Sequence, residues 1–182
     1  MQYTSHTYWY AINVKPRHEK AVSKALRNKG YEEFLPLCLT LNKIAKPGRG
    51  AEIPLFPGYV FCRFNGKDRL PILTTPGVFS ILGNGSNLLP VEEDEIEMIQ
   101  RVVQARMNPQ PWPYLERGDV VRVEHGPLRG VEGIMQESKG QHRLVVSVKL
   151  LQRAVSVLVD RSDIAPASVE YERRAARVLA CG

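Results

Sequence analysis

The sequence predicts an α+β protein with two small domains, an antiparallel sheet with flanking helices followed by a small β-barrel. Over the first 107 residues, short apolar runs of strand length alternate with two longer amphipathic segments of helix length. Three prolines then fall within residues 108–113, where neither a helix nor a central strand can continue. Beyond them, β-branched residues alternate in short runs between Gly-containing turns, which is typical of a small barrel.

The first domain opens with a strand and a basic helix. Residues 9–14 are apolar and end at Lys15-Pro16, where proline suits the first position of a helix. We expect this helix to run to about Asn28 or Lys29 and to stop at Gly30. On a helical wheel the apolar side consists of Ala21, Val22, Ala25 and Leu26. The basic side consists of Arg17, Lys20, Lys24 and Arg27.

The rest of the first domain reads as extended segments and a second helix. Residues 31–41 are apolar with a break at Pro36, and residues 52–64 form a second extended segment with a turn at Pro57-Gly58. Between them lies a basic hairpin tip with Lys43, Lys46 and Arg49. A short helix is expected over 68–73, a strand over 77–82 and a long helix over 90–107. The long helix has an acidic first turn and a buried stripe of Ile96, Ile99, Val102 and Val103.

The proline-rich stretch sets the predicted domain boundaries. The first domain covers residues 1–107 and the linker covers residues 108–116. A barrel of five short strands is expected over 117–167. The tail over 168–182 either forms a helix or frays, and the sequence pattern does not distinguish between the two.

Positive charge is concentrated in the first third of the chain. The formal net charge is +6, and residues 1–69 hold 12 Lys and Arg against 5 Asp and Glu, whereas residues 70–107 hold 2 against 5. This asymmetry indicates a surface that faces a polyanion. The alternative is an ordinary solvated helix face.

Cysteine spacing and hydropathy exclude several classes of protein. Cys38, Cys62 and Cys181 have no CxxC spacing, which argues against a disulfide framework and a zinc site and favours reduced thiols. No apolar run has the length of a membrane span, and the N-terminus lacks the features of a signal peptide. We therefore expect a cytoplasmic protein that does not contact a membrane.

Signatures of catalysis are missing from the sequence. The histidines His6, His18, His125 and His142 lie on separate predicted elements without ligand-like spacing to a Cys or carboxylate. No GxSxG, P-loop or HExxH string occurs, and the acidic run at 92–97 fits a helix N-terminus better than a metal site. We expect no catalytic residue, no metal and no cofactor.

Several local strings together resemble a known family. KPRHEK at 15–20, FLP at 34–36, PLFPGYVFCRF at 54–64 and TPGV at 75–78 resemble the NGN domain of NusG-family transcription elongation factors, closest to specialised UpxY-, RfaH- and LoaP-like members. GDVVRVEHGPLRGVEGIM at 118–135 resembles the KOW motif, where Gly126 and Gly130 suit turn conformations. The resemblance covers residues 7–166. It implies an NGN-like sheet domain, a KOW (SH3-like) barrel and a non-enzymatic regulator of transcription.

The resemblance also implies a surface for RNA polymerase. In the family, an apolar patch of the NGN domain binds the clamp helices of the largest polymerase subunit, a task suited to aromatic anchors. Motif match carries this role to Phe56, Tyr59 and Phe61, and then to Tyr8, Tyr10 and Ile81. Alternation after Gly58 predicts that Tyr59 and Phe61 share one sheet face. The alternative is that several of these side chains are ordinary core, as expected for Trp9 and Val60.

Two further surfaces follow from the resemblance. Upstream duplex DNA or the non-template strand is expected to contact the basic helix, because phosphate contacts need positive charge. The candidate residues are Arg17, His18, Lys20, Lys24 and Arg27. A ribosomal protein or the termination factor Rho is the expected partner of the barrel, at Leu150, Leu151 and Arg153. Housekeeping members often carry an aromatic residue in place of Leu151.

The implied function is that of a monomeric factor that promotes processive elongation or antitermination, with the KOW domain recruiting a further factor. One alternative is a general family member that couples polymerase to Rho or to the ribosome. The other is a KOW-containing ribosomal or RNA-binding protein that has no contact with polymerase.

Overall fold

The computed structural model describes residues 6–40, 51–84, 87–112, 118–138 and 140–167. The chain divides into two compact units, one ending at Ile96 and the other beginning at Glu97. Three predicted features lie wholly or partly outside the described residues, namely the basic hairpin tip with Lys43, Lys46 and Arg49, the tail, and part of the linker.

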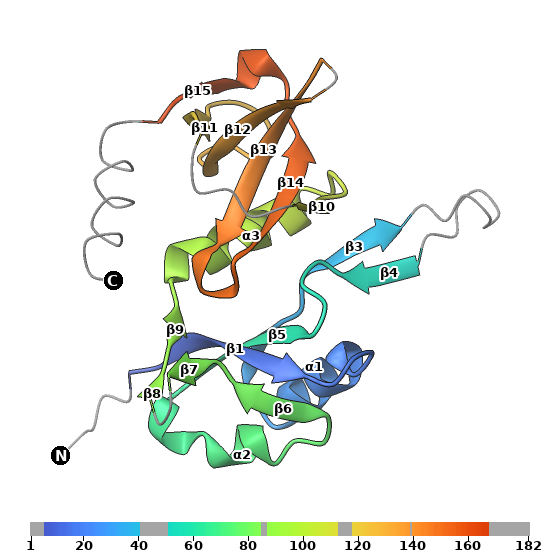
Figure 1. Cartoon of the computed structure of the whole chain (residues 1–182), viewed down its shortest axis with the longest axis vertical. Coiled ribbons are helices and arrows are strands. Elements are labelled where there is room, and N and C mark those ends of the chain that lie inside the picture. Colours follow the sequence, from blue (N-terminus) through green and yellow to red (C-terminus); the bar gives the residue numbers. More distant parts are fainter. Residues whose placement is uncertain (1–5, 41–50, 85–86, 113–117, 139, 168–182) are drawn as a thin grey trace. The chain divides into compact units, whose positions relative to one another are not determined.

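The first unit is built around a central strand that pairs along both edges (Figure 1). β1 (Tyr8–Val14) pairs with β5 (Tyr59–Phe64) on one side and with β6 (Val78–Ile81) and β9 (Pro90–Val91) on the other. β2 (Glu32–Phe34) pairs with the outer edge of β5. All of these pairs are antiparallel, so the predicted antiparallel sheet is confirmed.

Short hairpins and turns connect these strands. β3 (Leu37–Thr40) pairs with β4 (Ala51–Pro54), and β7 (Gly83–Asn84) pairs with β8 (Asn87–Leu88). The break at Pro36 separates β2 from β3, as predicted. The predicted short helix is present as a 3-10 turn over Gly66–Asp68 followed by α2 (Leu70–Leu73).

The first helix differs from its prediction in its start and in its buried side. α1 (Glu19–Asn28) begins after Pro16, because Arg17 has a φ of 66° that a right-handed helix cannot accommodate. Its buried residues are Glu19, Val22, Ser23 and Leu26. Ala21, which the helical wheel placed on the apolar side, is exposed.

One face of the first sheet packs against α1 and α2. Tyr10, Ile12 and Val14 of β1 and Val60, Cys62 and Phe64 of β5 point toward that face and form a core with Val22, Leu26 and Ile72. The rings of Tyr10 and Phe64 lie 4.6 Å apart between centroids. Trp9, Tyr59 and Phe61 alternate with these residues and therefore lie on the opposite face.

The second unit contains a six-stranded antiparallel sheet in the order β10-β14-β13-β12-β11-β15. Its strands are β10 (Gln110–Trp112), β11 (Val120–Val123), β12 (Glu132–Ser138), β13 (Gln141–Val148), β14 (Arg153–Leu158) and β15 (Ile164–Pro166). Val121, Leu144, Val146, Val155 and Val157 are buried as its core. The five predicted strands after residue 117 are thus confirmed, as is the α+β fold class with an antiparallel sheet and flanking helices followed by a second, all-β sheet.

The last helix and the proline-rich stretch lie at the division between the units. α3 (Glu93–Gln104) has the predicted acidic first turn, and Ile96, Ile99 and Val102 are fully buried. Residues 110–112, predicted as linker, instead form β10 and pair with β14. An outer strand tolerates Pro111 because it needs no ladder N–H on its open side. Within the described ranges, no helix combines the length and apolar character needed to cross a membrane.

Candidate functional site

Aromatic side chains gather on the face of the first sheet opposite α1 and α2. Phe61 lies directly across from Phe34 on β2, with their ring centroids 6.2 Å apart, and meets Phe56 edge-on at 5.7 Å. Trp9 and Tyr59 share this face by strand alternation. We call Trp9, Phe34, Phe56, Tyr59 and Phe61 the aromatic face.

The members of the aromatic face differ in exposure. Phe56 is 1% exposed and Phe61 0%, and their rings pack against each other, while Phe61 also stacks on Phe34. The expectation that both are exposed anchors is therefore wrong for the folded chain. Tyr59 is half-buried and so retains accessible surface. The prediction that Tyr59 and Phe61 share a face is confirmed.

The remaining aromatic and apolar candidates lie elsewhere. Tyr10 and Ile81 belong to the core beneath α1 and α2 and thus point away from the aromatic face. Burial raises the pKa of the Tyr10 hydroxyl, with a smaller contribution from Tyr8. Tyr8 lies at the start of β1 and is 51% exposed.

The basic residues of α1 are exposed, but two of them already have acidic partners. The Lys20 Nζ atom lies 3.6 Å from the Glu52 carboxylate, and both side chains are more than half exposed. Arg27 Nε donates to Glu33 Oε1 at 2.8 Å, and the Glu33 side chain is only 3% exposed. Lys24 is exposed on the same side of the helix. Lys20, Lys24 and Arg27 thus form the basic stripe on α1, with Arg27 anchored at one end, whereas Arg17, which the helical wheel placed on this side, precedes the helix.

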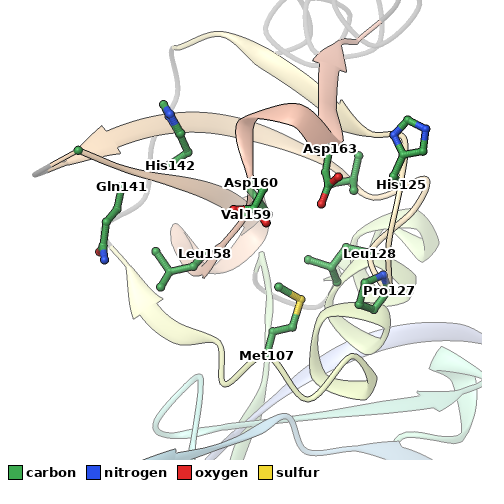
Figure 2. A pocket seen from close by; sticks show the side chains of 12 residues that line it. Met107, His125, Pro127, Leu128, Gln141, His142, Leu158, Val159, Asp160 and Asp163 are labelled. Atoms are coloured by element: carbon green, nitrogen blue, oxygen red, sulfur yellow. The ribbon is translucent and has the colours of Figure 1, made fainter.

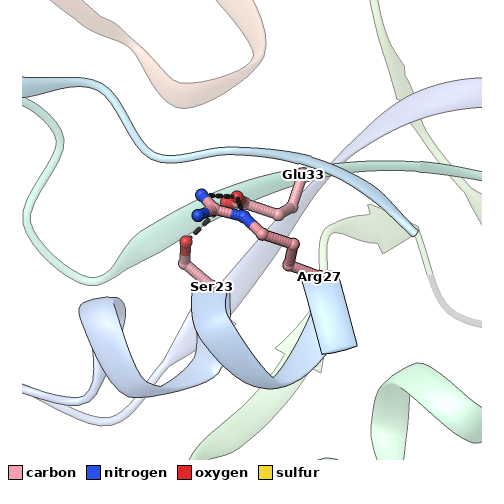
Figure 3. A network of polar contacts seen from close by, with 3 residues as sticks. All are labelled: Ser23, Arg27 and Glu33. Atoms are coloured by element: carbon pink, nitrogen blue, oxygen red, sulfur yellow. Dashed lines mark hydrogen bonds and ion pairs between the residues drawn. The ribbon is translucent and has the colours of Figure 1, made fainter. Parts of the chain in front are cut away.

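A groove of about 460 Å³ lies between α1 and the segment around β2. Ser23 Oγ donates to Glu33 Oε2 at 2.5 Å in its wall, while Arg27 bonds to the other carboxylate oxygen (Figure 3). Lys24 and Phe34 also line the groove, so it joins the basic stripe to the aromatic face. The role of Glu33 was not predicted from sequence, because two adjacent acids at the start of a short strand resemble surface residues.

Arg17 and His18 lie in the loop between β1 and α1 and are exposed. The His18 ring donates its Nδ1–H to the carbonyl of Pro16 at 3.0 Å. The amide of Lys15 donates to the carbonyl of Gly77 at 2.9 Å. The loop is thus fastened to the turn that precedes β6.

The predicted partner surface of the barrel lies in the connection between β13 and β14. Leu151 is 9% exposed, Leu150 is half-buried and Arg153 is exposed. Leu151 therefore belongs to the barrel core. Leu150 and Arg153 retain accessible surface.

A second hollow, of about 400 Å³, lies in the C-terminal unit (Figure 2). Met107, Leu128 and Leu158 supply its apolar lining, and His125, His142, Asp160 and Asp163 supply its polar lining. Sequence reasoning placed the two histidines on separate elements, and the fold brings both to this hollow. Even so, no three His, Cys, Asp or Glu side chains in the described part of the chain form a group able to hold a metal ion.

The described cysteines are buried and unpaired. Burial raises the pKa of the Cys38 thiol. Burial, and to a smaller extent Glu33 and Glu32, raises the pKa of the Cys62 thiol to about 12. Thiolate chemistry at neutral pH is therefore not expected of either residue. Cys181 lies outside the described residues.

Comparison with known proteins gives matches over most of the chain. A family model described as "Transcription termination factor nusG" matches residues 7–100. Proteins named "Transcription termination/antitermination protein NusG" are 32% identical over 170 residues in Escherichia coli O6:H1 and 27% identical over 169 residues in Helicobacter pylori strain 26695. Each alignment covers 86% of this chain, and they cover 94% and 96% of the two relatives.

A solved structure titled "Domain interaction in Thermotoga maritima NusG" is similar in fold. It matches with a TM-score of 0.51 and 20% sequence identity, covering 90% of this chain and 98% of that one. At this identity the likeness supports the fold alone.

Proposed function

Because this chain belongs to the NusG family of transcription termination and antitermination factors, we propose that it is a non-enzymatic regulator that binds RNA polymerase through its aromatic face. The observation that carries the proposal is that the family match over residues 7–100 contains the complete aromatic face. That face lies opposite the one covered by α1 and α2. Its expected partner is the pair of clamp helices of the largest polymerase subunit.

Within this face, Tyr59 is the proposed direct contact, since it is half-buried and lies beside the buried Phe56 and Phe61. An aromatic side chain in such a setting offers large apolar area at little entropic cost. Phe56 and Phe61, which are buried, are proposed to support its position. Tyr8, more than half exposed at the strand start, is a peripheral candidate.

The polymerase proposal is tested by measuring affinity of the full chain for core RNA polymerase. Tyr59→Ala is expected to weaken binding about tenfold or more, the effect of losing a central aromatic anchor. Leu70→Ala is the control, because Leu70 is 68% exposed on α2, away from the aromatic face. A tagged chain that recovers ribosomal RNA and no polymerase would favour a KOW-containing ribosomal or RNA-binding protein instead.

The basic stripe is proposed to contact upstream or non-template DNA as it leaves polymerase. Its residues are Arg17, His18, Lys20, Lys24 and Arg27, which are exposed beside the groove or in the adjoining loop. Lys24→Ala is expected to weaken binding to a transcription-bubble DNA and to reduce the salt slope by about one. Lys67→Ala, an exposed lysine in the Gly66–Asp68 turn, is the matched control. An unchanged salt slope for Lys24→Ala would show that Lys24 faces solvent and does not contact the DNA.

The barrel is proposed to recruit a further factor through Leu150, Leu151 and Arg153. The half-buried Leu150 and the exposed Arg153 support this surface, whereas the buried Leu151 is proposed to hold the connection in place. Purified Rho and the ribosome are the two partners to compare, with Leu150→Ser expected to reduce capture of the true one. If Leu150→Ser captured both Rho and the ribosome as well as wild type does, the partner would bind another surface of the barrel.

The proposed outcome is processive elongation or antitermination by a monomeric, cytoplasmic factor, as in specialised family members. Transcription through a Rho-dependent terminator in a purified system measures this directly. Added protein is expected to increase readthrough, and increased termination would identify a general coupling factor.

A further inference from the structure

Glu19 is a buried carboxylate in the first turn of α1 that does not cap its own helix. It is 6% exposed, and the N-cap residue His18 makes no side-chain capping bond. The Glu19 Oε1 atom instead accepts the backbone N–H of Gly58 at 2.9 Å. A carboxylate is thus held against a turn that lies far from it in the sequence.

Gly58 is fixed through both of its backbone groups. Its N–H donates to Glu19, and its carbonyl accepts the N–H of Val14, the last residue of β1, at 2.9 Å. The backbone of Gly58 is left-handed, with a φ of 86°, and a Cβ atom there would meet nothing within 4 Å. Backbone conformation, and not lack of space, therefore makes glycine suitable at this position.

The two residues that hold Gly58 flank the loop that carries Arg17 and His18. Arg17 has a φ of 66°, which is unfavourable for a residue with a side chain and persists only when the surroundings enforce it. Gly77 provides the enforcement on the other side: its carbonyl accepts the N–H of Lys15, and a Cβ at Gly77 would lie 3.2 Å from His18 Cβ. The loop is therefore clamped between the Gly58 turn and the Gly77 turn.

The residue after Gly58 is Tyr59, the proposed polymerase contact. Its N–H donates to the Phe56 carbonyl at 3.1 Å, and it pairs with Asn13 on β1. The Glu19 carboxylate thus bonds to the turn that places Tyr59, and it also starts the helix that follows the Arg17 loop. One side chain connects both candidate surfaces of the first unit.

We infer that Glu19 is a positioning residue that holds the Gly58 turn and the loop over residues 15–18 as one preorganised unit, so that Tyr59 and Arg17 face their partners together. This inference rests on the proposed polymerase docking. Without the carboxylate, the part-buried Gly58 N–H loses its partner, and the left-handed turn has no bond to α1. Binding must then include the cost of reordering the turn.

Glu19→Leu and Glu19→Gln distinguish the effect of the bond to Gly58 from the effect of filling the volume of the side chain. Leucine fills a similar volume without an acceptor, whereas glutamine keeps a carbonyl oxygen for Gly58. In the full chain, at a temperature where each variant is folded, Glu19→Leu is expected to bind core RNA polymerase about tenfold more weakly and Glu19→Gln within about twofold of wild type. Amide exchange at Gly58 is expected to accelerate in Glu19→Leu alone. A folded Glu19→Leu chain with a freely exchanging Gly58 and wild-type affinity would overturn the inference.

A second pair of variants tests the turn if Glu19→Leu does not fold. Both Gly58→Asn and Gly58→Val keep the backbone N–H, but asparagine tolerates a left-handed backbone and the β-branched valine does not. Gly58→Asn is expected to retain affinity and Gly58→Val to lose about tenfold, and equal affinities would contradict the positioning role. Tyr59→Ala leaves the Glu19 bond in place. If it binds as wild type, the docking proposal fails, and the positioning role for docking fails with it.

Discussion

At the scale of single residues, burial sets the chemistry of the cysteine at the centre of the first sheet. Cys62 is 0% exposed on the face beneath α1 and α2. Burial first, and then the carboxylates of Glu33 and Glu32, raises the pKa of its thiol to about 12. Because the thiolate is the reactive form, this side chain is inert in the folded protein and serves packing.

Alkaline unfolding tests this pKa. The folded-state value of about 12 exceeds the usual value of 9.0, so the folded state holds the thiol proton more tightly than the unfolded state does. The contribution to stability is therefore full below about pH 9 and is lost as pH rises toward 12. Urea unfolding is expected to show that the free energy of unfolding falls more between pH 8 and pH 10 for wild type than for Cys62→Ala. Equal losses would place the Cys62 pKa near its ordinary value.

Arg17 is a residue whose backbone strain and charge can be separated. Its left-handed φ of 66° costs about 1–2 kcal/mol, which glycine avoids at an entropic cost of about 0.5–1 kcal/mol. Arg17→Gly is expected to leave the free energy of unfolding unchanged or raise it by up to about 1 kcal/mol, while weakening DNA binding. Arg17→Lys keeps charge and strain and is the control. A destabilised Arg17→Gly chain would contradict the strain argument.

At the scale of elements, polar contacts rotate α1 relative to its apolar pattern. Hydrophobicity alone places Ala21 on the buried side, yet Ser23 and Glu19 are buried in its stead. Ser23 bonds to the Glu33 carboxylate on β2, and Glu19 bonds to the Gly58 amide. Two satisfied polar side chains thus decide which side of the helix faces the sheet, because a buried polar group is tolerated once it is bonded.

Matched substitutions on α1 test this orientation. Ala21→Gln is expected to change the free energy of unfolding by less than about 0.5 kcal/mol, because Ala21 is exposed. Ser23→Gln is expected to cost about 1–3 kcal/mol, since it overpacks a buried site and disturbs the bond to Glu33. Urea denaturation measures both. The reverse order of costs would support the orientation drawn from the apolar pattern.

At the scale of the whole molecule, the chain divides within a helix and not at its proline-rich stretch. The first unit ends at Ile96, inside α3, and the second begins at Glu97. β10 joins the C-terminal sheet through β14, and Arg143 lies 5.1 Å from the ring centroid of Trp112 as a cation–π contact. The segment before the KOW motif therefore belongs to the second unit.

Fragments test where the second unit begins. A fragment over 97–182 is expected to be more stable than one over 117–182 by roughly 1 kcal/mol or more, because it keeps the pairing of β10 with β14 and the contact between Trp112 and Arg143. The urea midpoints and slopes of the two fragments provide the measurement. Equal stabilities would show that residues 97–116 act only as a linker.

The amino-acid sequence by itself determined the fold class and the periodic elements. Alternation aligned Tyr59 with Phe61, Pro36 separated two strands, and the acidic run placed the start of α3. The motifs that resemble the NusG family also identified the candidate surfaces. Such features are local, because the side-chain period of a strand or helix is set by the backbone geometry of that segment alone.

Only the tertiary structure decided which of the candidate site residues are accessible and which already contact other residues of the chain. Phe56 and Phe61 are buried and in contact with each other, Phe61 also stacks on Phe34 from another strand, and Glu19 bonds to Gly58. The proline-rich residues 110–112 form an edge strand because β14 provides a strand with which they pair. These outcomes depend on groups distant in sequence, whose pairing no local periodicity specifies.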